Sequence, residues 1–458
     1  MRQQTIDNDY IHRPDNRKLD HLPGDYGKPL IGYTFAMLKD PFSVFADMRA
    51  RYGDVYRFNT TFQRMLIVSH PDYIKLLTLD PEQIFSPRMG YHGPLKDFFK
   101  GGLLMRDFGE HRVHRRIMQT AFKTDSMRRY VEQMNPIIAS QASDWSQQND
   151  FRFYPNIKKL LLDIGANVFL GLDMGADETV KLNQSFLDMM AGSLALIRKD
   201  WPGLGLVYRK GMNGRRELER FFIDLVPKRR AVDGTDMASY FAKETDDNGE
   251  LFSDEVVAQH LIFLLLAAHD TTTSVLTMTC SFLAHHTDWQ DRVREELASA
   301  ADKGLAYDDL ANLTHTENLF KEVLRLHPPV PQFARRTVKD TEIGGHHVPA
   351  DTLLQAPVLY IQRMEEFWTD PHNFDPDRFA EGREEHKKHP FQWAPFGGGA
   401  HKCIGLHFAN MLFKCVLGEV LTRYRLEFPE GYEYPSPIQH FPFAKPVDDL
   451  PLRLVPLR

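Results

Sequence analysis

The stretch that decides the fold is Phe396-Gly397-Gly398-Gly399-Ala400-His401-Lys402-Cys403-Ile404-Gly405, followed by a helical pattern of apolar residues from Leu406 to Arg425. Three consecutive glycines permit backbone angles that a β-carbon forbids and let the backbone approach a flat partner closely. Cys403 stands just before the following helix, whose free N–H groups and dipole favour a thiolate and lower its pKa. The stretch therefore predicts a ligating or reactive sulfur.

A glycine-rich loop before a helix can also bind phosphate, but this loop matches neither GxxxxGK[ST] nor GxGxxG. The chain has three cysteines, Cys280, Cys403 and Cys415, and no CxxC pair. This set predicts neither a disulfide framework nor a zinc ribbon, and it suits a reducing compartment. Cys280 and Cys415 fall inside helical patterns, so we expect them to be small core residues.

A second unusual stretch, Ala267-Ala268-His269-Asp270-Thr271-Thr272, lies within a long apolar helix that we expect to begin at Asp254, with Ser253 as its N-cap. Asp and Thr are unfavourable in a buried helix because their side chains compete for backbone hydrogen bonds. The two alanines leave room for a ligand, and an acid followed by an alcohol can carry protons inward. A threonine-rich stretch with a surface aspartate is the alternative interpretation.

Two further groups of charged residues are commonplace when taken singly. Glu322 and Arg325 lie three residues apart on one helix face, where they can form an ion pair. Arg378, in the stretch from Phe374 to Phe379, offers a second arginine to the same carboxylate. A cationic group consists of His111 and Arg115, which share a helix face, and Arg335, which follows a proline-rich bend.

The composition predicts one large folded unit. The chain has 458 residues, of which 42% are hydrophobic, and no repeat or linker divides it. We therefore expect a single domain over 1–458, with a polar N-terminal extension at 1–25 that resembles neither a secretory signal nor a membrane anchor. The formal net charge of -6 gives no general attraction to nucleic acid.

The hydrophobic periodicity predicts a mainly α fold with a minor β part. The strand candidates are 55–59 and 65–69, which form a hairpin, and the runs near 338–343 and 352–356. The apolar run 256–283 contains His260, His269 and Asp270, so we expect a buried helix and not a membrane span.

In this order and at these separations, the four segments resemble the cytochrome P450 family over most of the chain. The family's haem-loop pattern F-x-x-G-x-[RH]-x-C-x-G is matched by Phe396, Gly399, His401, Cys403 and Gly405. The oxygen-activation pattern [AG]-[AG]-x-[DE]-T is matched by Ala267, Ala268, Asp270 and Thr271. The E-x-x-R, P-x-R-F and [WH]-x-x-x-R patterns are matched by Glu322, Arg325, Arg378, His111 and Arg115.

The resemblance implies the cytochrome P450 fold, with haem b held between the long central helix and the helix after the cysteine loop. It casts Cys403 as the axial thiolate ligand of the iron, and Asp270 and Thr271 as the catalytic residues that deliver protons for O–O bond cleavage. Glu322, Arg325 and Arg378 become a buried structural triad. The residues implied to bind haem are His111, Arg115, Arg335, Phe396, Gly397, His401, Cys403 and Gly405.

Two departures bear on the branch of the family. Arginine is commoner at the position of His401, so the propionate contact there depends on protonation. Loops of this kind resemble those of sterol demethylases and retinoid hydroxylases. A sterol 14-demethylase is disfavoured, because such enzymes carry His at the position of Asp270 and a loop motif that is absent from 91–104.

The resemblance implies a monooxygenase that inserts one oxygen atom from O2 into a hydrophobic small molecule. Electrons then come from a separate ferredoxin and ferredoxin reductase, and we expect a cytoplasmic monomer. A peroxide-driven peroxygenase is the first alternative, although such relatives tend to lack the Asp270–Thr271 pair. A haem-thiolate sensor, which has no need of that pair, and a haem-free binding protein are the others.

The substrate pocket is expected to be apolar and rich in aromatic side chains. Its predicted lining residues are Met89, Phe98, Leu104, Phe263, Ala267, Val330, Phe333 and Phe441. Aromatic residues and methionines at such spacing can equally belong to the core. The substrate class that fits this lining is terpenoid, steroid-like or fatty-acyl.

Overall fold

The computed structural model describes residues 19–61, 63–172, 177–195, 198, 204–246, 248–300 and 304–457. Residues 1–18 of the predicted N-terminal extension lie outside this part of the chain. Helices dominate the fold and strands form a smaller part, so the prediction of a mainly α architecture is confirmed. The α-helices are α1 (Thr34–Lys39), α2 (Pro41–Tyr52), α3 (Pro71–Leu79), α4 (Pro87–Leu95), α5 (Phe108–Gln119), α6 (Thr124–Trp145), α7 (Phe153–Ile164), α8 (Asp177–Ser193), α9 (Leu206–Arg230), α10 (Met237–Lys243), α11 (Asp254–His285), α12 (Thr287–Ala300), α13 (Thr314–Leu326), α14 (Val358–Ile361) and α15 (Leu406–Arg423).

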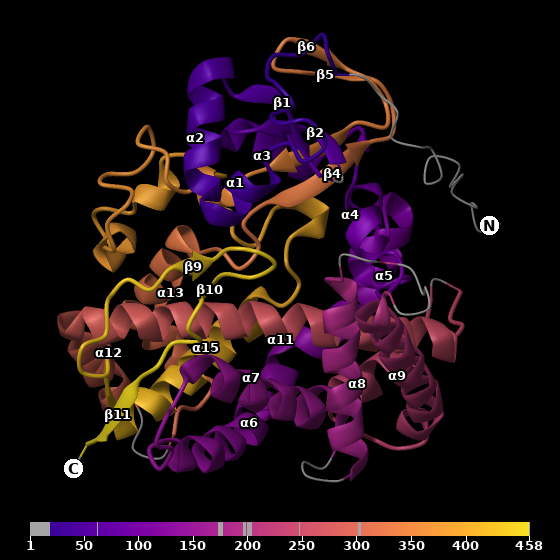
Figure 1. Cartoon of the computed structure of the whole chain (residues 1–458). Helices are drawn as coiled ribbons and strands as arrows, with labels where there is room; N and C mark the ends of the chain where they lie inside the picture. The colour runs from indigo at the N-terminus through magenta and orange to yellow at the C-terminus, as the bar shows by residue number, and fades with distance from the viewer. Residues whose placement is uncertain are drawn as a thin grey trace.

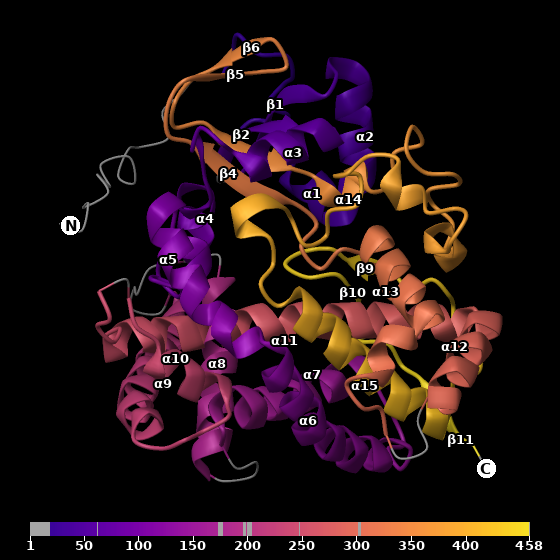
Figure 2. The same ribbon diagram turned by 180° about the vertical axis from the view of Figure 1, so that it is seen from behind.

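Helix α11 crosses the whole molecule, with the β-rich part on one side and helices α6 and α7 on the other (Figure 1). It begins where the sequence predicts, because the Ser253 hydroxyl accepts a hydrogen bond from the Val256 N–H and two carboxylates occupy the first turn. Seen from behind, α15 lies beside α11 (Figure 2). The two helices that the sequence predicts to flank the cofactor are therefore neighbours.

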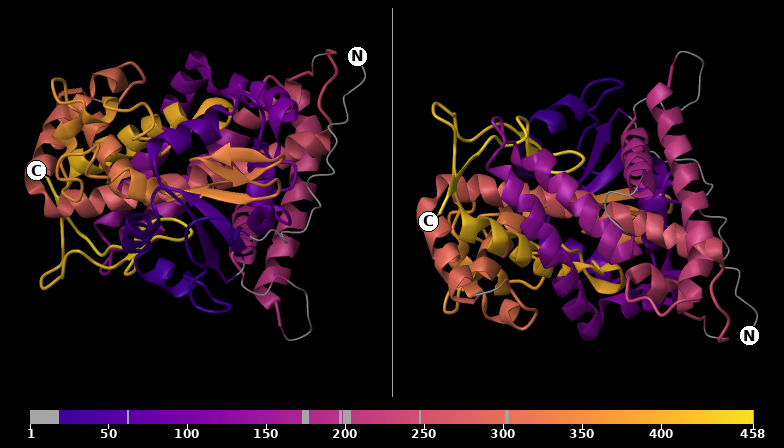
Figure 3. Two further views of the ribbon diagram at one scale, coloured as in Figure 1. Left: turned by 90° about the horizontal axis from the view of Figure 1, so that it is seen from above. Right: turned by 90° about the horizontal axis from the view of Figure 1, so that it is seen from below.

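The main sheet has five strands in the order β1-β2-β7-β4-β3. The strands are β1 (Val55–Thr60), β2 (Gln63–Val68), β3 (Phe85–Ser86), β4 (Phe333–Thr337) and β7 (Leu353–Ala356). The predicted hairpin is β1 and β2, which pair with Val55 opposite Val68. Strand β2 pairs in parallel with β7, so the sheet joins the N-terminal and C-terminal parts of the chain. In the view from above, these strands lie over the helical layer (Figure 3).

Three two-stranded sheets complete the β part. They are β5 (Thr341–Ile343) with β6 (His346–Val348), β8 (Tyr424–Glu427) with β11 (Arg453–Pro456), and β9 (Ile438–Gln439) with β10 (Lys445–Pro446). Strand β8 corrects one expectation, because the helix after the cysteine loop ends at Arg423 and not at Arg425. Tyr424 and Arg425 are extended and pair with Pro456 and Val455.

The core has a helical part and a sheet part. Buried side chains of α6, α7, α11, α13 and α15 form the larger cluster, and the hairpin, β4 and β7 form the second. Two described segments, α11 and Gly399–Arg423, are long and apolar enough to span a membrane, but 72% and 61% of their apolar windows are buried in the fold. Both are therefore core helices of this structure, as the polar residues inside 256–283 predicted for α11.

Candidate functional site

The cysteine loop enters helix α15 through a tight turn. The Cys403 N–H donates to the Phe396 carbonyl over 2.9 Å, and residues Gly399–His401 form one turn of 3-10 helix. Gly397 and Gly399 have φ values of +66° and +58°, in the region that favours glycine. The loop therefore closes on itself and places the sulfur one turn before Leu406, the first residue of α15.

The three consecutive glycines of this loop have different surroundings. The expectation that all three approach a flat partner is therefore corrected. A β-carbon at Gly399 would lie 1.8 Å from the Thr78 carbonyl oxygen at the end of α3, and one at Gly398 would lie 2.8 Å from the Thr78 hydroxyl. These two glycines are needed for packing against the protein. A β-carbon at Gly397 or Gly405 would meet no protein atom within 4 Å, so these two border open space.

The electrostatics of Cys403 differ from the prediction. Burial raises the pKa of the Cys403 thiol, and this outweighs the Gly405 N–H hydrogen bond and the charges of Arg115 and Lys402, which lower it. The helix terminus alone thus does not produce a low pKa. The side chain is nevertheless solvent-accessible, whereas Cys280 and Cys415 are buried. A sulfur that is both surrounded by protein and accessible faces internal space.

Four cationic or imidazole side chains from three segments lie close together, and one of them, Arg115, interacts electrostatically with Cys403. The rings of His111 on α5 and His401 in the cysteine loop stack with centroids 3.6 Å apart. Burial and the charges of Arg115 and Arg335 lower the pKa of His111 to about 4. Burial, His111 and the same two arginines lower the pKa of His401 to about 2, so both rings are neutral at physiological pH.

Among the described residues, the two arginines of this group have no carboxylate partner. Within the part of the chain that the structure describes, no Asp or Glu oxygen lies within 4.0 Å of the Arg115 or Arg335 guanidinium. Arg335 is 5% exposed, and burial lowers its pKa. Guanidinium groups in such surroundings are typical binding partners of carboxylates, and haem carries two. The donor set, the accessible sulfur and the open space at Gly397 and Gly405 therefore fit a haem.

In the middle of α11, consecutive residues point to different neighbours. The Asp270 carboxylate is 5% exposed, and its Oδ1 lies 3.0 Å from Lys158 Nζ on α7 and 3.2 Å from His269 Nδ1. Thr271, about 100° further around the helix, donates its hydroxyl proton to the Ala267 carbonyl over 2.8 Å. Ala267 is exposed although most of its helix is buried, so this part of α11 is not covered by other protein atoms.

The charge of Asp270 is stabilised from two sides. Burial would raise the pKa of its carboxyl, but the contact with His269 and the charges of His269 and Lys158 outweigh burial and hold the pKa below its usual range. Lys158 is 25% exposed, so it connects the buried carboxylate with solvent. Lys158 is 112 positions from Asp270 and belongs to no motif, so the sequence alone does not identify it as part of the site.

Glu322, Arg325 and Arg378 meet in a fully buried cluster. Arg325 donates from Nε and Nη2 to the two oxygens of Glu322 over 2.7 and 2.8 Å, and Arg378 donates from Nε over 3.1 Å. All three side chains are 0% exposed. Glu385, which no sequence motif identifies, is a fourth member of the cluster and accepts a hydrogen bond from Arg378 over 3.2 Å. The remaining guanidinium protons are donated to backbone carbonyls, so the charges are satisfied.

The predicted pocket residues do not all have free surface. Phe98 is 0% exposed, and its ring packs edge-on against Tyr208 at 5.6 Å and close to Gly192, so it belongs to the contact with α8 and α9. Met89 and Phe333 are also buried. The predicted residues that keep accessible surface are Leu104, Phe263, Ala267, Val330 and Phe441. The predicted lining is therefore corrected for the buried residues Phe98, Met89 and Phe333.

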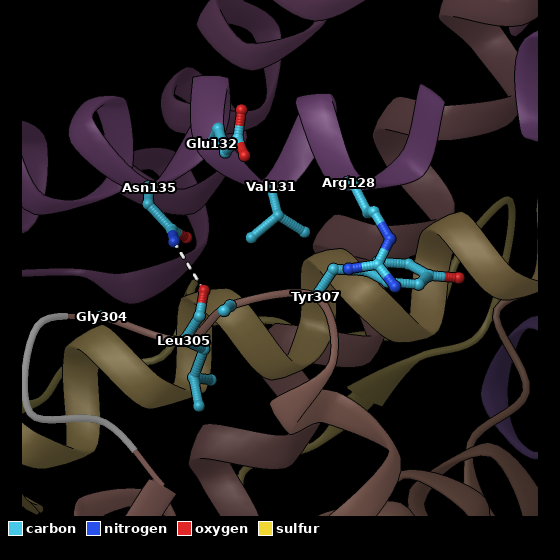
Figure 4. A pocket seen from close by; sticks show the side chains of 8 residues that line it. Arg128, Val131, Glu132, Asn135, Gly304, Leu305 and Tyr307 are labelled. Atoms are coloured by element: carbon cyan, nitrogen blue, oxygen red, sulfur yellow. Dashed lines mark hydrogen bonds between the residues drawn. The ribbon is translucent and has the colours of Figure 1, made fainter. Parts of the chain in front are cut away.

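A separate open pocket of about 260 Å³ lies between α6 and the segment that precedes α13 (Figure 4). Arg128, Val131, Glu132 and Asn135 line one side, and Gly304 to Tyr307 line the other. The Asn135 amide donates to the Leu305 carbonyl across it over 2.8 Å. This pocket contains none of the predicted site residues.

The family model described as "Cytochrome P450" matches residues 22–448. The chain therefore belongs to the cytochrome P450 family, and it is a monooxygenase, an oxidoreductase that incorporates oxygen from O2.

The chain is 35% identical to a putative cytochrome P450 136 of Mycobacterium tuberculosis, over 97% of this chain and 90% of that protein. It is 26% identical to abscisic acid 8'-hydroxylase 2 of Arabidopsis thaliana, over 98% of this chain and 92% of that protein. The solved structure of retinoic acid bound cyanobacterial CYP120A1 superposes with a TM-score of 0.85 at 23% identity, covering 95% of this chain and 99% of that one. The predicted P450 fold is thus confirmed.

Proposed function

We propose that Cys403 would supply the thiolate ligand of a haem b, and that Arg115 and Arg335, together with His111 and His401, would hold its two carboxylates. The observation that carries this assignment is the solvent-accessible Cys403 next to Arg115, which belongs to the same cluster as Arg335, while neither arginine has a carboxylate within 4.0 Å among the described residues. Phe396, Gly397 and Gly405 belong to the same loop and would contact the haem on the sulfur side. When bound, the thiolate-ligated iron activates O2 for insertion into a C–H bond.

Asp270 and Thr271 move the protons that this reaction consumes. The Asp270 carboxylate receives a proton from solvent at the Lys158 side, because Lys158 is the part of the pair that reaches the surface. Rotation of the carboxylate away from Lys158 carries the proton toward Thr271. Among the described residues, the Thr271 hydroxyl bonds to the Ala267 carbonyl of its own helix, and it would be free to exchange that bond for one to a bound molecule.

The substrate is a hydrophobic small molecule, and a terpenoid is the class that we propose. Support comes from the apolar side chains that keep accessible surface, above all Phe263 and Ala267 on α11 and Val330 before β4. A relative of nearly equal length hydroxylates abscisic acid, which is a terpenoid. Steroid-like and fatty-acyl compounds fit the same apolar lining.

The enzyme takes its electrons from separate proteins, a ferredoxin and its reductase, and works as a single-domain, cytoplasmic monomer. The match of one family model to residues 22–448 supports a single P450 unit in this part of the chain. The two apolar helices that could span a membrane are mostly buried in the fold, which supports a soluble enzyme.

The decisive experiment is the difference spectrum of the purified, reduced protein with carbon monoxide. The wild-type protein is expected to give the red-shifted Soret band of a thiolate-ligated haem, and Cys403→Ala is expected to lose it. Cys415→Ala, at a buried cysteine of α15, is the control and should keep it. A wild-type spectrum without this band contradicts the assignment of Cys403. Turnover with reductant and O2, compared with peroxide alone, then separates the monooxygenase from a peroxygenase.

A further inference from the structure

A buried pair of histidines joins α5 to α11. His114 Nδ1 lies 2.8 Å from His260 Nε2, with ring centroids 5.0 Å apart. The two side chains are only 8% and 2% exposed, and they are 146 positions apart in the sequence. A hydrogen bond between two interior side chains on different helices fixes the position of one helix relative to the other.

Both rings of this pair are neutral, which determines the direction of the hydrogen bond. Burial lowers the pKa of His114 to about 3 and that of His260 well below its usual value, and the nearby Arg106 adds to both shifts. The other ring nitrogen of His260, Nδ1, is buried without a partner. A proton there would be an unsatisfied donor, whereas a bare nitrogen costs less. The His260 Nε2–H therefore donates to His114 Nδ1.

The same helix α5 presents two of the predicted haem contacts. His111 lies one turn before His114 and stacks on His401 of the cysteine loop, and Arg115 follows His114 directly. Residues three apart in a helix are neighbours on its surface. Helix α5 is thus attached to the cysteine loop by His111 and to α11 by His114. A shift of α5 along its axis would displace His111 and Arg115 together.

We propose that His114 and His260 are positioning residues that hold α5 in the place where His111 and Arg115 retain the haem. This inference rests on the proposed haem site, and it assigns to two residues outside that site the control of how long the cofactor stays bound. Neither residue belongs to the proposed haem contacts, since the pair acts through the position of the helix.

The test is the rate at which ferric haem leaves the holoprotein for an excess of apomyoglobin. His260→Leu is expected to lose haem about tenfold faster than the wild type, because one buried hydrogen bond is removed and one His114 nitrogen is left unpaired. His260→Gln keeps an N–H donor and should restore most of the retention. Ser274→Ala removes another buried hydrogen bond of α11, to the Ala444 carbonyl over 2.6 Å, and should leave the rate unchanged.

The double variant His114→Leu/His260→Leu separates positioning from stability. It leaves no unpaired polar group, so its thermal stability is expected to return toward that of the wild type, while haem loss stays fast. The proposal is overturned if the double variant loses haem at the rate of the wild type. It is also overturned if His260→Leu loses haem no faster than Ser274→Ala. A wild-type protein that never binds haem refutes the proposed function itself and is recognised before any variant is compared.

Discussion

Lys158 Nζ lies 3.0 Å from Asp270 Oδ1, and this ion pair joins the surface of α7 to the buried middle of α11. The Asp270 carboxylate, which the proposed reaction needs, can therefore be in two states. It is either paired with Lys158 or released from it. Lys158 is thus the residue through which the activity of Asp270 is most directly tested.

Replacing Lys158 with Met is expected to shift the pH dependence of turnover. Without the ammonium charge the pKa of Asp270 rises, so the acid limb of the kcat/KM profile should move to higher pH by about one unit. Lys159→Met is the control, because Lys159 is 69% exposed and pairs with Asp163 on the surface. Profiles measured from pH 5 to 9 that coincide for both variants would contradict a role of Lys158 in holding Asp270.

Replacing Thr271 with Ala is expected to slow product formation about 100-fold, with reductant diverted to hydrogen peroxide, because the proton-carrying hydroxyl is lost. The partner of this hydroxyl among the described residues is the Ala267 carbonyl of the same helix, so the fold should be unaffected. Thr273→Ala is a matched control, since its hydroxyl makes the same type of bond to His269 but is fully buried. The measurement is product and peroxide formed per reductant consumed. Full coupling in Thr271→Ala would instead favour a haem-thiolate sensor or a different proton route.

Replacing Arg378 with Leu is expected to destabilise the fold by about 3–5 kcal/mol, because Glu322 and Glu385 lose a buried partner. Arg292→Leu, which breaks a half-exposed pair with Asp377, should cost less than about 1 kcal/mol. Chemical unfolding followed by circular dichroism measures both. Equal losses of unfolding free energy in the two variants would show that burial does not make the ion pairs of Arg378 more important for stability than an exposed pair.

Replacing Gly399 with Ala is expected to disrupt the cysteine loop, because the added carbon collides with the Thr78 carbonyl and the backbone has a positive φ. The haem content of the purified protein should fall by more than half. Gly397→Ala shares the positive φ but meets no protein atom within 4 Å, so it isolates the backbone effect from the collision. If the two variants have the same unfolding free energy, packing against Thr78 is not the reason for the glycine at 399.

Acid is expected to destabilise the protein through His114. Its pKa is about 3 in the folded protein and about 6.5 in an unfolded chain. As the pH falls below 6.5, His114 is protonated in the unfolded state but stays neutral in the folded state. The free energy of unfolding therefore decreases toward pH 3, by up to about 1.4 kcal/mol per pH unit. Guanidinium unfolding of the wild type and of His114→Leu/His260→Leu at several pH values measures this slope. The unfolding free energy of the double variant should depend less steeply on pH than that of the wild type. A steeper dependence would contradict the conclusion that His114 is neutral in the folded protein.

The sequence is sufficient to predict features that depend on local pattern. The Ser253 N-cap places the start of α11, and the spacing from Phe396 to Gly405 places the cysteine loop. Residues that act through the tertiary fold carry no such signal. Lys158 and Glu385 are ordinary charged residues in the sequence, and only the packing of distant segments makes them partners of Asp270 and Arg378.

The predictions that the structure corrects, for Phe98 and Cys403, also failed because they depend on the tertiary fold. A phenylalanine such as Phe98 has the composition expected of a pocket, but the close approach of α8 and α9 at Gly192 encloses its ring. The helix that follows Cys403 predicts a lowered pKa for its thiol, yet burial has the larger effect and raises the pKa. The burial of a side chain depends on the tertiary fold and not on the local sequence pattern.

The parallel pairing of β2 with β7 has a consequence for synthesis of the protein. Val68 ends a hairpin that is complete early in translation, but the strand that covers its open edge begins only at Leu353. At about 5–20 residues per second, the ribosome needs tens of seconds to supply that partner. During this interval the nascent hairpin exposes an unpaired edge, which is the kind of surface that chaperones shield and that aggregation exploits.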